Sequence, residues 1–192
     1  MHIAAYIVIA IAFGISNMLL FRRCAELTPI RLSRGLWLTF FVALVQVALF
    51  VGGMAIGNLL RFELPDDADA FRQANAWIFM GLDIIVMLRM LKPYLRREPK
   101  LPLFDLGNNK VQIALALTAA VNPMLVGLGA GFVASSAEFK VILPIVMLVL
   151  MWLFGYWGVM FGRRKVEMRP RRWMIIAAVL LVGVAVAAIV NA

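Results

Sequence analysis

Six long apolar runs, separated by shorter charged segments, most constrain the fold of this 192-residue chain. Each run is long enough to cross the ~30 Å hydrocarbon core of a bilayer as an α-helix that rises about 1.5 Å per residue. Apolar residues make up 64% of the sequence, and a soluble domain of this size would expose that excess as a large apolar patch. The sequence therefore predicts one all-α membrane domain with six transmembrane helices. The expected spans are about 3–21, 35–60, 77–95, 111–133, 141–161 and 173–190.

The charges between these runs predict how the helices lie across the membrane. Sixteen of the 19 Lys and Arg residues fall in or beside the loops between spans one and two, three and four, and five and six. Because basic loops stay on the cytoplasmic side, we expect both termini to be extracytoplasmic, in a bacterial inner membrane. The net charge of +9 then reflects topology and contact with lipid headgroups. A nucleic-acid partner is not expected.

A shift of 105 residues brings polar and glycine positions of the two halves of the chain into register. The positions that coincide are Asn17 with Asn122, Leu20 with Leu125, Gly53 with Gly158, and Gly57 with Gly162. Because each half holds three spans, an odd number, the second half enters the membrane from the opposite side. The sequence thus predicts two inverted three-helix repeats, about 1–95 and 111–192, joined by a cytoplasmic loop of about 96–110. Transporters built this way hold their substrate at the repeat interface, near the bilayer midplane.

The fourth span carries the adjacent pair Asn122 and Pro123 near its middle. Proline removes a backbone donor and clashes with the preceding turn, which predicts an interruption of this helix. Such an interruption is tolerated where protein or a water-filled cavity surrounds it. Asn17 lies at the same expected depth, so we expect both amides to line one polar cavity. The alternative is a simple kink, with each amide bonded to a neighbouring helix.

Other polar side chains within the spans are further candidate ligands. Asp83 is the only acid inside an expected span, and a carboxylate there is costly enough to indicate a functional site. Its alternative role is structural, as the partner of an arginine or a backbone group. Gln46 adds an amide that is either a ligand or a bond between helices. Ser16 adjoins Asn17, although such hydroxyls often bond to their own helix.

Several function classes are not expected from this sequence. It contains no nucleotide-binding loop, no cluster of His and Cys residues, and no motif of a catalytic nucleophile. Its single cysteine, Cys24, forms no internal disulfide and has no metal-ligand spacing around it. We therefore expect neither an enzyme nor a bound cofactor.

Three segments resemble the MntP family of manganese efflux pumps, which is related to the LysE superfamily of small exporters. They are FGIS in the first span, VNPMLVGLGAGF in the fourth, and the stretch from Trp77 to Arg89 in the third. The resemblance implies two three-helix repeats and a secondary transporter that exports Mn²⁺ or a related divalent cation. It also implies a metal site formed by Ser16, Asn17, Gln46, Asp83 and Asn122.

The chain departs from the family pattern at the site itself. The family carries Ser-x-Asp in its first and fourth helices, with the aspartates expected to bind Mn²⁺, whereas this chain has Asn17 and Asn122. Gln46 stands where the family tends to have an acid. Amide oxygens can coordinate a hard cation but do not neutralise its charge. Two alternatives therefore stay open: an exporter of a neutral or small organic substrate, and a membrane subunit that does not transport. The oligomeric state is also open.

Overall fold

The computed structural model describes residues 3–27, 31–60, 68–95, 109–133 and 139–190. Regular structure in these residues consists of six α-helices, all long and apolar enough to cross a membrane. The all-α membrane fold predicted from the sequence is thereby confirmed. The helices are α1 (Ile3–Leu27), α2 (Leu32–Leu59), α3 (Ala68–Leu95), α4 (Asn109–Val133), α5 (Phe139–Arg163) and α6 (Pro170–Val190).

Several helices extend beyond the apolar runs that identified them. Helix α3 begins at Ala68, well before the expected start at residue 77, and α1 continues to Leu27 rather than ending near residue 21. The apolar run marks only the part of a helix that lies in hydrocarbon, and polar residues continue the helix outside it. The predicted interruption at Pro123 is wrong, because α4 is continuous through this residue. Membrane helices tolerate proline where neighbouring groups satisfy the freed carbonyl.

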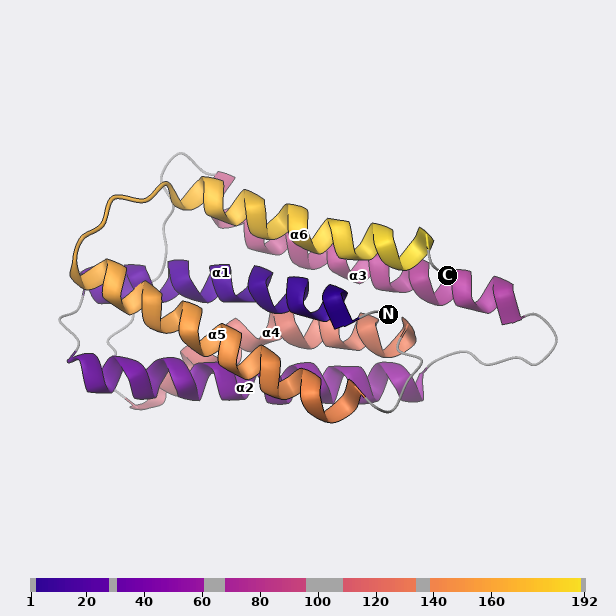
Figure 1. The fold of residues 1–192 in the computed structure, drawn as a ribbon, viewed down its shortest axis with the longest axis horizontal. Helices are drawn as coiled ribbons and strands as arrows, with labels where there is room; N and C mark the ends of the chain where they lie inside the picture. Colours follow the sequence, from indigo (N-terminus) through magenta and orange to yellow (C-terminus); the bar gives the residue numbers. More distant parts are fainter. Residues whose placement is uncertain (1–2, 28–30, 61–67, 96–108, 134–138, 191–192) are drawn as a thin grey trace.

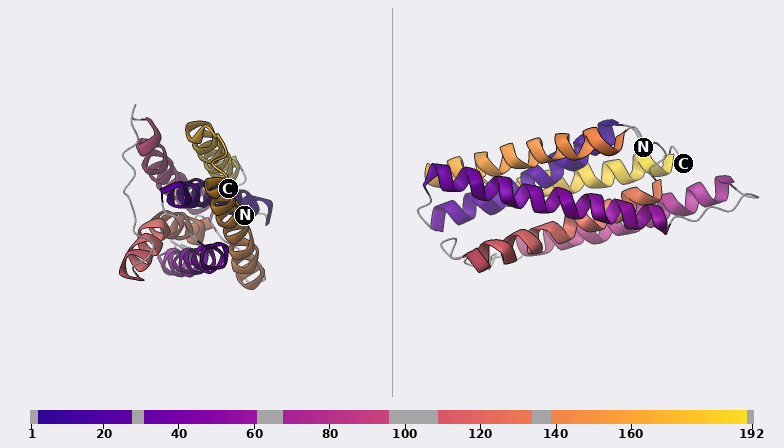
Figure 2. Two further views of the ribbon diagram at one scale, coloured as in Figure 1. Left: turned by 90° about the vertical axis from the view of Figure 1, so that its left-hand side faces the viewer. Right: turned by 90° about the horizontal axis from the view of Figure 1, so that it is seen from below.

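The axes of the six helices are roughly aligned, and both termini lie at the same end of the bundle (Figure 1). Seen end-on, α3 and α6 lie on one side of the bundle and α2 lies on the other, with α1 between them (Figure 2). The most extensive contacts join α1 to α5 and α2 to α4, and α3 packs on α6 and α4. When α1, α2 and α3 are exchanged with α4, α5 and α6, the α1–α5 contact becomes the α4–α2 contact, and the α3–α6 contact is unchanged. The inverted relation between the halves stays a prediction.

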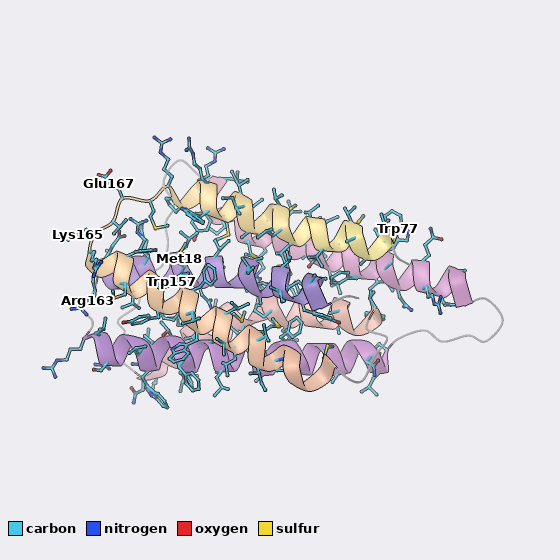
Figure 3. All side chains as sticks on the ribbon, viewed as in Figure 1. Met18, Trp77, Trp157, Arg163, Lys165 and Glu167 are labelled. Atoms are coloured by element: carbon cyan, nitrogen blue, oxygen red, sulfur yellow. The ribbon has the colours of Figure 1, made fainter. Side chains whose placement is uncertain are left out.

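The end of the bundle opposite the termini is basic. Figure 3 shows Arg163, Lys165 and Glu167 there, while Trp77 lies toward the end that carries the termini. Large apolar side chains cover the sides of the bundle, with Trp37 70% exposed. A lateral surface of this kind fits contact with lipid, and the charge asymmetry favours a cytoplasmic location for the basic end.

Cysteine labelling tests this orientation. In a background in which Cys24 is replaced by alanine, we expect Gln73→Cys to react with a membrane-impermeant thiol reagent added to intact cells. We expect Glu167→Cys to react only after the cells are opened. Both positions are exposed, so a difference in labelling reports sidedness rather than burial. The reverse pattern would invert the topology.

Glycine allows α2 to pack closely on α4. A Cβ atom at Gly53 would collide with the backbone carbonyl of Met124, and a Cβ at Gly57 would collide with the carbonyl of Leu128. The backbones of the two helices are therefore in direct contact along this strip, as in other small-xxx-small membrane interfaces.

The interface between α5 and α1 repeats this arrangement. A Cβ at Gly158 would collide with the carbonyl of Met18, and one at Gly162 with the carbonyl of Arg22. Gly53 and Gly158 are 105 residues apart, as the sequence shift requires, but their partners Met124 and Met18 are 106 residues apart. By packing, the counterpart of Asn122 in α1 is therefore Ser16 rather than Asn17, which corrects the predicted match by one residue.

Candidate functional site

A cavity of about 230 Å³ lies within the bundle, between its middle and its basic end. Asn17, Gln46 and Asn122 line its inner part, and each lies near the midpoint of its helix. Asn17 and Asn122 thus line one shared cavity, as the sequence predicts. Ser16 lines it as well. Other residues that line the cavity include Arg23, Arg89, Tyr94, Thr118 and Ala119.

Asn17 and Gln46 form a closed pair of amides at the inner end of this cavity. The Asn17 Nδ2 donates to Gln46 Oε1 at 2.6 Å, and the Gln46 Nε2 donates to Asn17 Oδ1 at 2.9 Å. Gln46 Nε2 also donates to the backbone carbonyl of Ala119 at 3.3 Å. Both side chains are 2% exposed. Gln46 therefore ties α2 to α1 and α4 at once, so the alternative prediction of a bond between helices is confirmed for it.

Asn122 differs from Asn17 in having a free acceptor. Its Oδ1 is buried and has no hydrogen-bond partner among the described residues. Buried polar atoms without a partner are rare in folded proteins and mark places where water or a ligand binds. Thr118, one turn away on α4, donates its hydroxyl to the carbonyl of Ala114 at 2.7 Å. Of the two asparagines that line the cavity, Asn122 is thus the one whose side-chain oxygen is not already bonded to a described group.

Two arginines line the cavity on the side of the basic end. Arg23 comes from α1 and Arg89 from α3, and the buried Arg23 Nε has no hydrogen-bond partner in the described part of the chain. Neighbouring Arg22 bonds Glu26 at 2.6 Å. Sequence reasoning counted Arg23 and Arg89 only as topology signals, because they lie where the apolar runs end. The extra turns of α1 beyond residue 21 bring Arg23 onto the cavity wall.

Asp83, the fifth candidate ligand, is not among the lining residues of this cavity. It lies near the midpoint of α3, 0% exposed, and neither of its carboxyl oxygens has a hydrogen-bond partner among the described residues. Of the described residues that line the cavity, none carries a carboxylate. The described chain also lacks any group of three or more His, Cys, Asp and Glu side chains that could hold a metal ion. A metal role for Asp83 stays a prediction.

Comparison with known proteins identifies the family. The family model described as "Putative manganese efflux pump" matches residues 29–189, which include α2 to α5 and all but the last residue of α6 and exclude Ser16 and Asn17 on α1. No curated protein and no solved structure matches the chain. The family match covers most of the sequence, and a transporter family agrees with the six apolar helices. The chain belongs to the MntP family of manganese efflux pumps.

Proposed function

We propose that this chain is a secondary transporter that exports Mn²⁺ or a related divalent cation across a bacterial inner membrane. The observation that carries this proposal is the cavity, in which the unpaired Oδ1 of Asn122 lies in the middle of a membrane-spanning bundle. Oxygen donors suit Mn²⁺. Family membership supports the direction of transport, and the position of the cavity between the middle of the bundle and its basic end supports loading from the cytoplasm.

Ser16, Asn17, Gln46 and Asn122 are the proposed contacts of the cargo. Asn17 and Gln46 bond each other in the structure, so in this state they offer fewer free oxygens than Asn122. Without a carboxylate on the wall, the ion would keep part of its water shell and bind weakly. Weak binding suits a carrier, because the cargo must also leave.

A second candidate cargo is a neutral or small organic solute. The observation that favours it is the presence of Arg23 and Arg89 on the cavity wall together with amides and hydroxyls. Two positive side chains repel a divalent cation, at an energy that depends on how far water screens them. They attract a carboxylate and pair with it through two parallel hydrogen bonds.

The sign of the response to Arg89→Gln separates these two cargoes. If Mn²⁺ is the cargo, removing this positive charge should raise the rate of radioactive Mn²⁺ uptake into inverted vesicles several-fold at low salt. If the cargo is an organic acid or zwitterion, the same change should weaken its transport and leave Mn²⁺ uptake at the level of empty vesicles.

Arg163→Gln is the matched control, because Arg163 is an exposed basic residue of the same end that does not line the cavity. An equal response to both substitutions would mean that only the surface charge matters. Native vesicles that take up no more Mn²⁺ than empty vesicles would remove manganese from the proposal. A chain that moves no solute in either assay would favour the membrane subunit that does not transport.

A further inference from the structure

Asp83 is a buried charge-bearing group that the proposed cargo site leaves unused. It is fully buried on α3, and both of its oxygens lack hydrogen-bond partners among the described residues. An acid kept for structural reasons inside a bundle is held by a partner, because an isolated carboxylate in a low-dielectric interior is very unfavourable. A carboxyl without a partner is stable there only when it carries a proton.

The packing of α3 on α4 gives the position of Asp83 along the bundle axis relative to the cargo cavity. A Cβ at Gly129 of α4 would meet Phe79 and Leu82 of α3. This contact shows which residues of the two antiparallel helices lie at the same height along the bundle axis. Counting along both helices from this contact puts Asp83 about one turn, ~5 Å, beyond Asn122 on the side away from the basic end. Farther along α3, Arg89 and Tyr94 form part of the cavity wall. Helix α3 therefore carries both the buried Asp83 and residues that line the cargo cavity.

The charged groups on the elements around Asp83 all lie toward the helix ends. Among the described side chains, α3 itself carries Arg72 near its start and Arg89 and Lys92 near its end, and its neighbours α4 and α6 carry theirs in their first turns. Helix α1, which shares the cavity with α3, carries its charges in its last two turns. The groups on these three helices are Lys110, Arg171, Arg172, Arg22, Arg23 and Glu26. Neither carboxyl oxygen of Asp83 accepts a hydrogen bond from any described group, so binding a proton is the remaining way to neutralise this carboxylate.

We propose that Asp83 is the proton-binding site that couples transport to the proton gradient. Its carboxylate takes one proton from water when the outer side opens, forming an O–H bond. It returns that proton to water on the cytoplasmic side, so that one proton enters for each cargo exported. This inference rests on the proposed transport function and holds for either cargo, since the acid lies outside the cargo cavity.

Two transport modes separate a proton site from a cargo ligand. In liposomes containing the purified chain, radioactive Mn²⁺ uptake driven by a pH gradient needs the proton, whereas exchange of Mn²⁺ for Mn²⁺ at equal pH does not. We expect Asp83→Asn to lower gradient-driven uptake more than tenfold and to change exchange by less than about twofold. Asp83→Glu should restore part of the driven uptake.

Asn75→Leu is the matched control, since Asn75 is another buried polar residue of α3 whose Oδ1 has no partner in the described chain. It should leave both modes within about twofold of native. Loss of both modes in a folded Asp83→Asn protein would make Asp83 a cargo ligand and overturn the proposal. So would retention of both modes.

Infrared spectroscopy tests the proton without any cargo. The native protein at neutral pH should show the carbonyl stretch of a protonated carboxyl, and this band should be missing from Asp83→Asn. If liposomes containing the native protein exchange no Mn²⁺, then Mn²⁺ is not the cargo. The infrared band still tests whether Asp83 binds a proton, because it does not depend on any cargo. Absence of the band from the native protein would overturn the proton site even where Mn²⁺ transport is intact.

Discussion

Replacing Gly53 with alanine should unfold or misassemble the bundle, whereas the same replacement at the adjacent Gly52 should be harmless. A Cβ at Gly53 would collide with the carbonyl of Met124 and approach the amide nitrogen of Leu128 to 2.9 Å, so the α2 and α4 backbones would have to separate. Overpacking of a tight interface costs about 1–3 kcal/mol, occasionally more. Because the contact is with backbone rather than a flexible side chain, we expect the upper part of that range.

Gly52 is a close control for this effect. It lies on the same helix and is exposed, and a Cβ there would meet nothing within 4 Å. Alanine at this position should stabilise α2 slightly, by up to about 1 kcal/mol, because alanine favours helix more than glycine does. Thermal unfolding of both variants in detergent measures the difference. Equal melting temperatures would show that α2 and α4 do not pack through Gly53.

Replacing Asn122 with aspartate should raise Mn²⁺ affinity at least tenfold, equivalent to about 1.4 kcal/mol. The substitution converts an oxygen that has no described partner into part of a carboxylate that faces the cavity. A carboxylate attracts a divalent cation much more strongly than an amide does in a site of low dielectric. Calorimetric titration of the purified variants with Mn²⁺ measures the change. Without Mn²⁺ the variant should also melt at a lower temperature than the native chain, because it buries a carboxyl group that has no described partner.

Asn17→Asp is the informative comparison, because the same chemical change meets a different environment. Asn17 Nδ2 donates to Gln46 Oε1, so a carboxylate here loses that bond and places two acceptors face to face. We expect a larger loss of stability and a smaller gain in affinity than at position 122. If Asn122→Asp binds Mn²⁺ no better than the native chain, Asn122 is not a ligand. If it also impairs transport, the cargo is the neutral or organic one.

The number of helices and the polar content of the cavity could be predicted from the sequence, for one physical reason. In a strongly apolar chain, groups such as Asn17, Gln46 and Asn122 are costly to bury, so they converge where they satisfy one another or a ligand. The same cost made Asp83 conspicuous. Its position relative to the cavity could not be predicted, because a helix that is apolar on most faces does not reveal which face meets a given neighbour.

Other features depend on contacts that a linear pattern does not contain. Matching residue types in the two halves pairs Asn17 of α1 with Asn122 of α4. The contacts of the glycines on α2 and α5 pair Ser16 with Asn122 instead, a difference of one residue. Arg89 lies at the end of the third expected span and counts there as a topology charge, because composition identifies the hydrocarbon boundary and not the rim of a cavity. The extension of α3 back to Ala68 was missed for a similar reason, as helix outside the bilayer leaves no apolar signal.

In the proposed transport cycle, the hydrogen bonds between Asn17 and Gln46 affect the step in which the carrier returns to its loading conformation without cargo. Polar groups that hold a solute lose that partner on its release, and closing the bundle around them would then bury unsatisfied donors. Here the two amides replace the lost contacts with each other, so the vacated pocket can close without that penalty. In the proposed cycle this pair of amides would lower the barrier to the return step, and a cargo would have to separate the pair in order to bind, so weaker binding would accompany faster turnover.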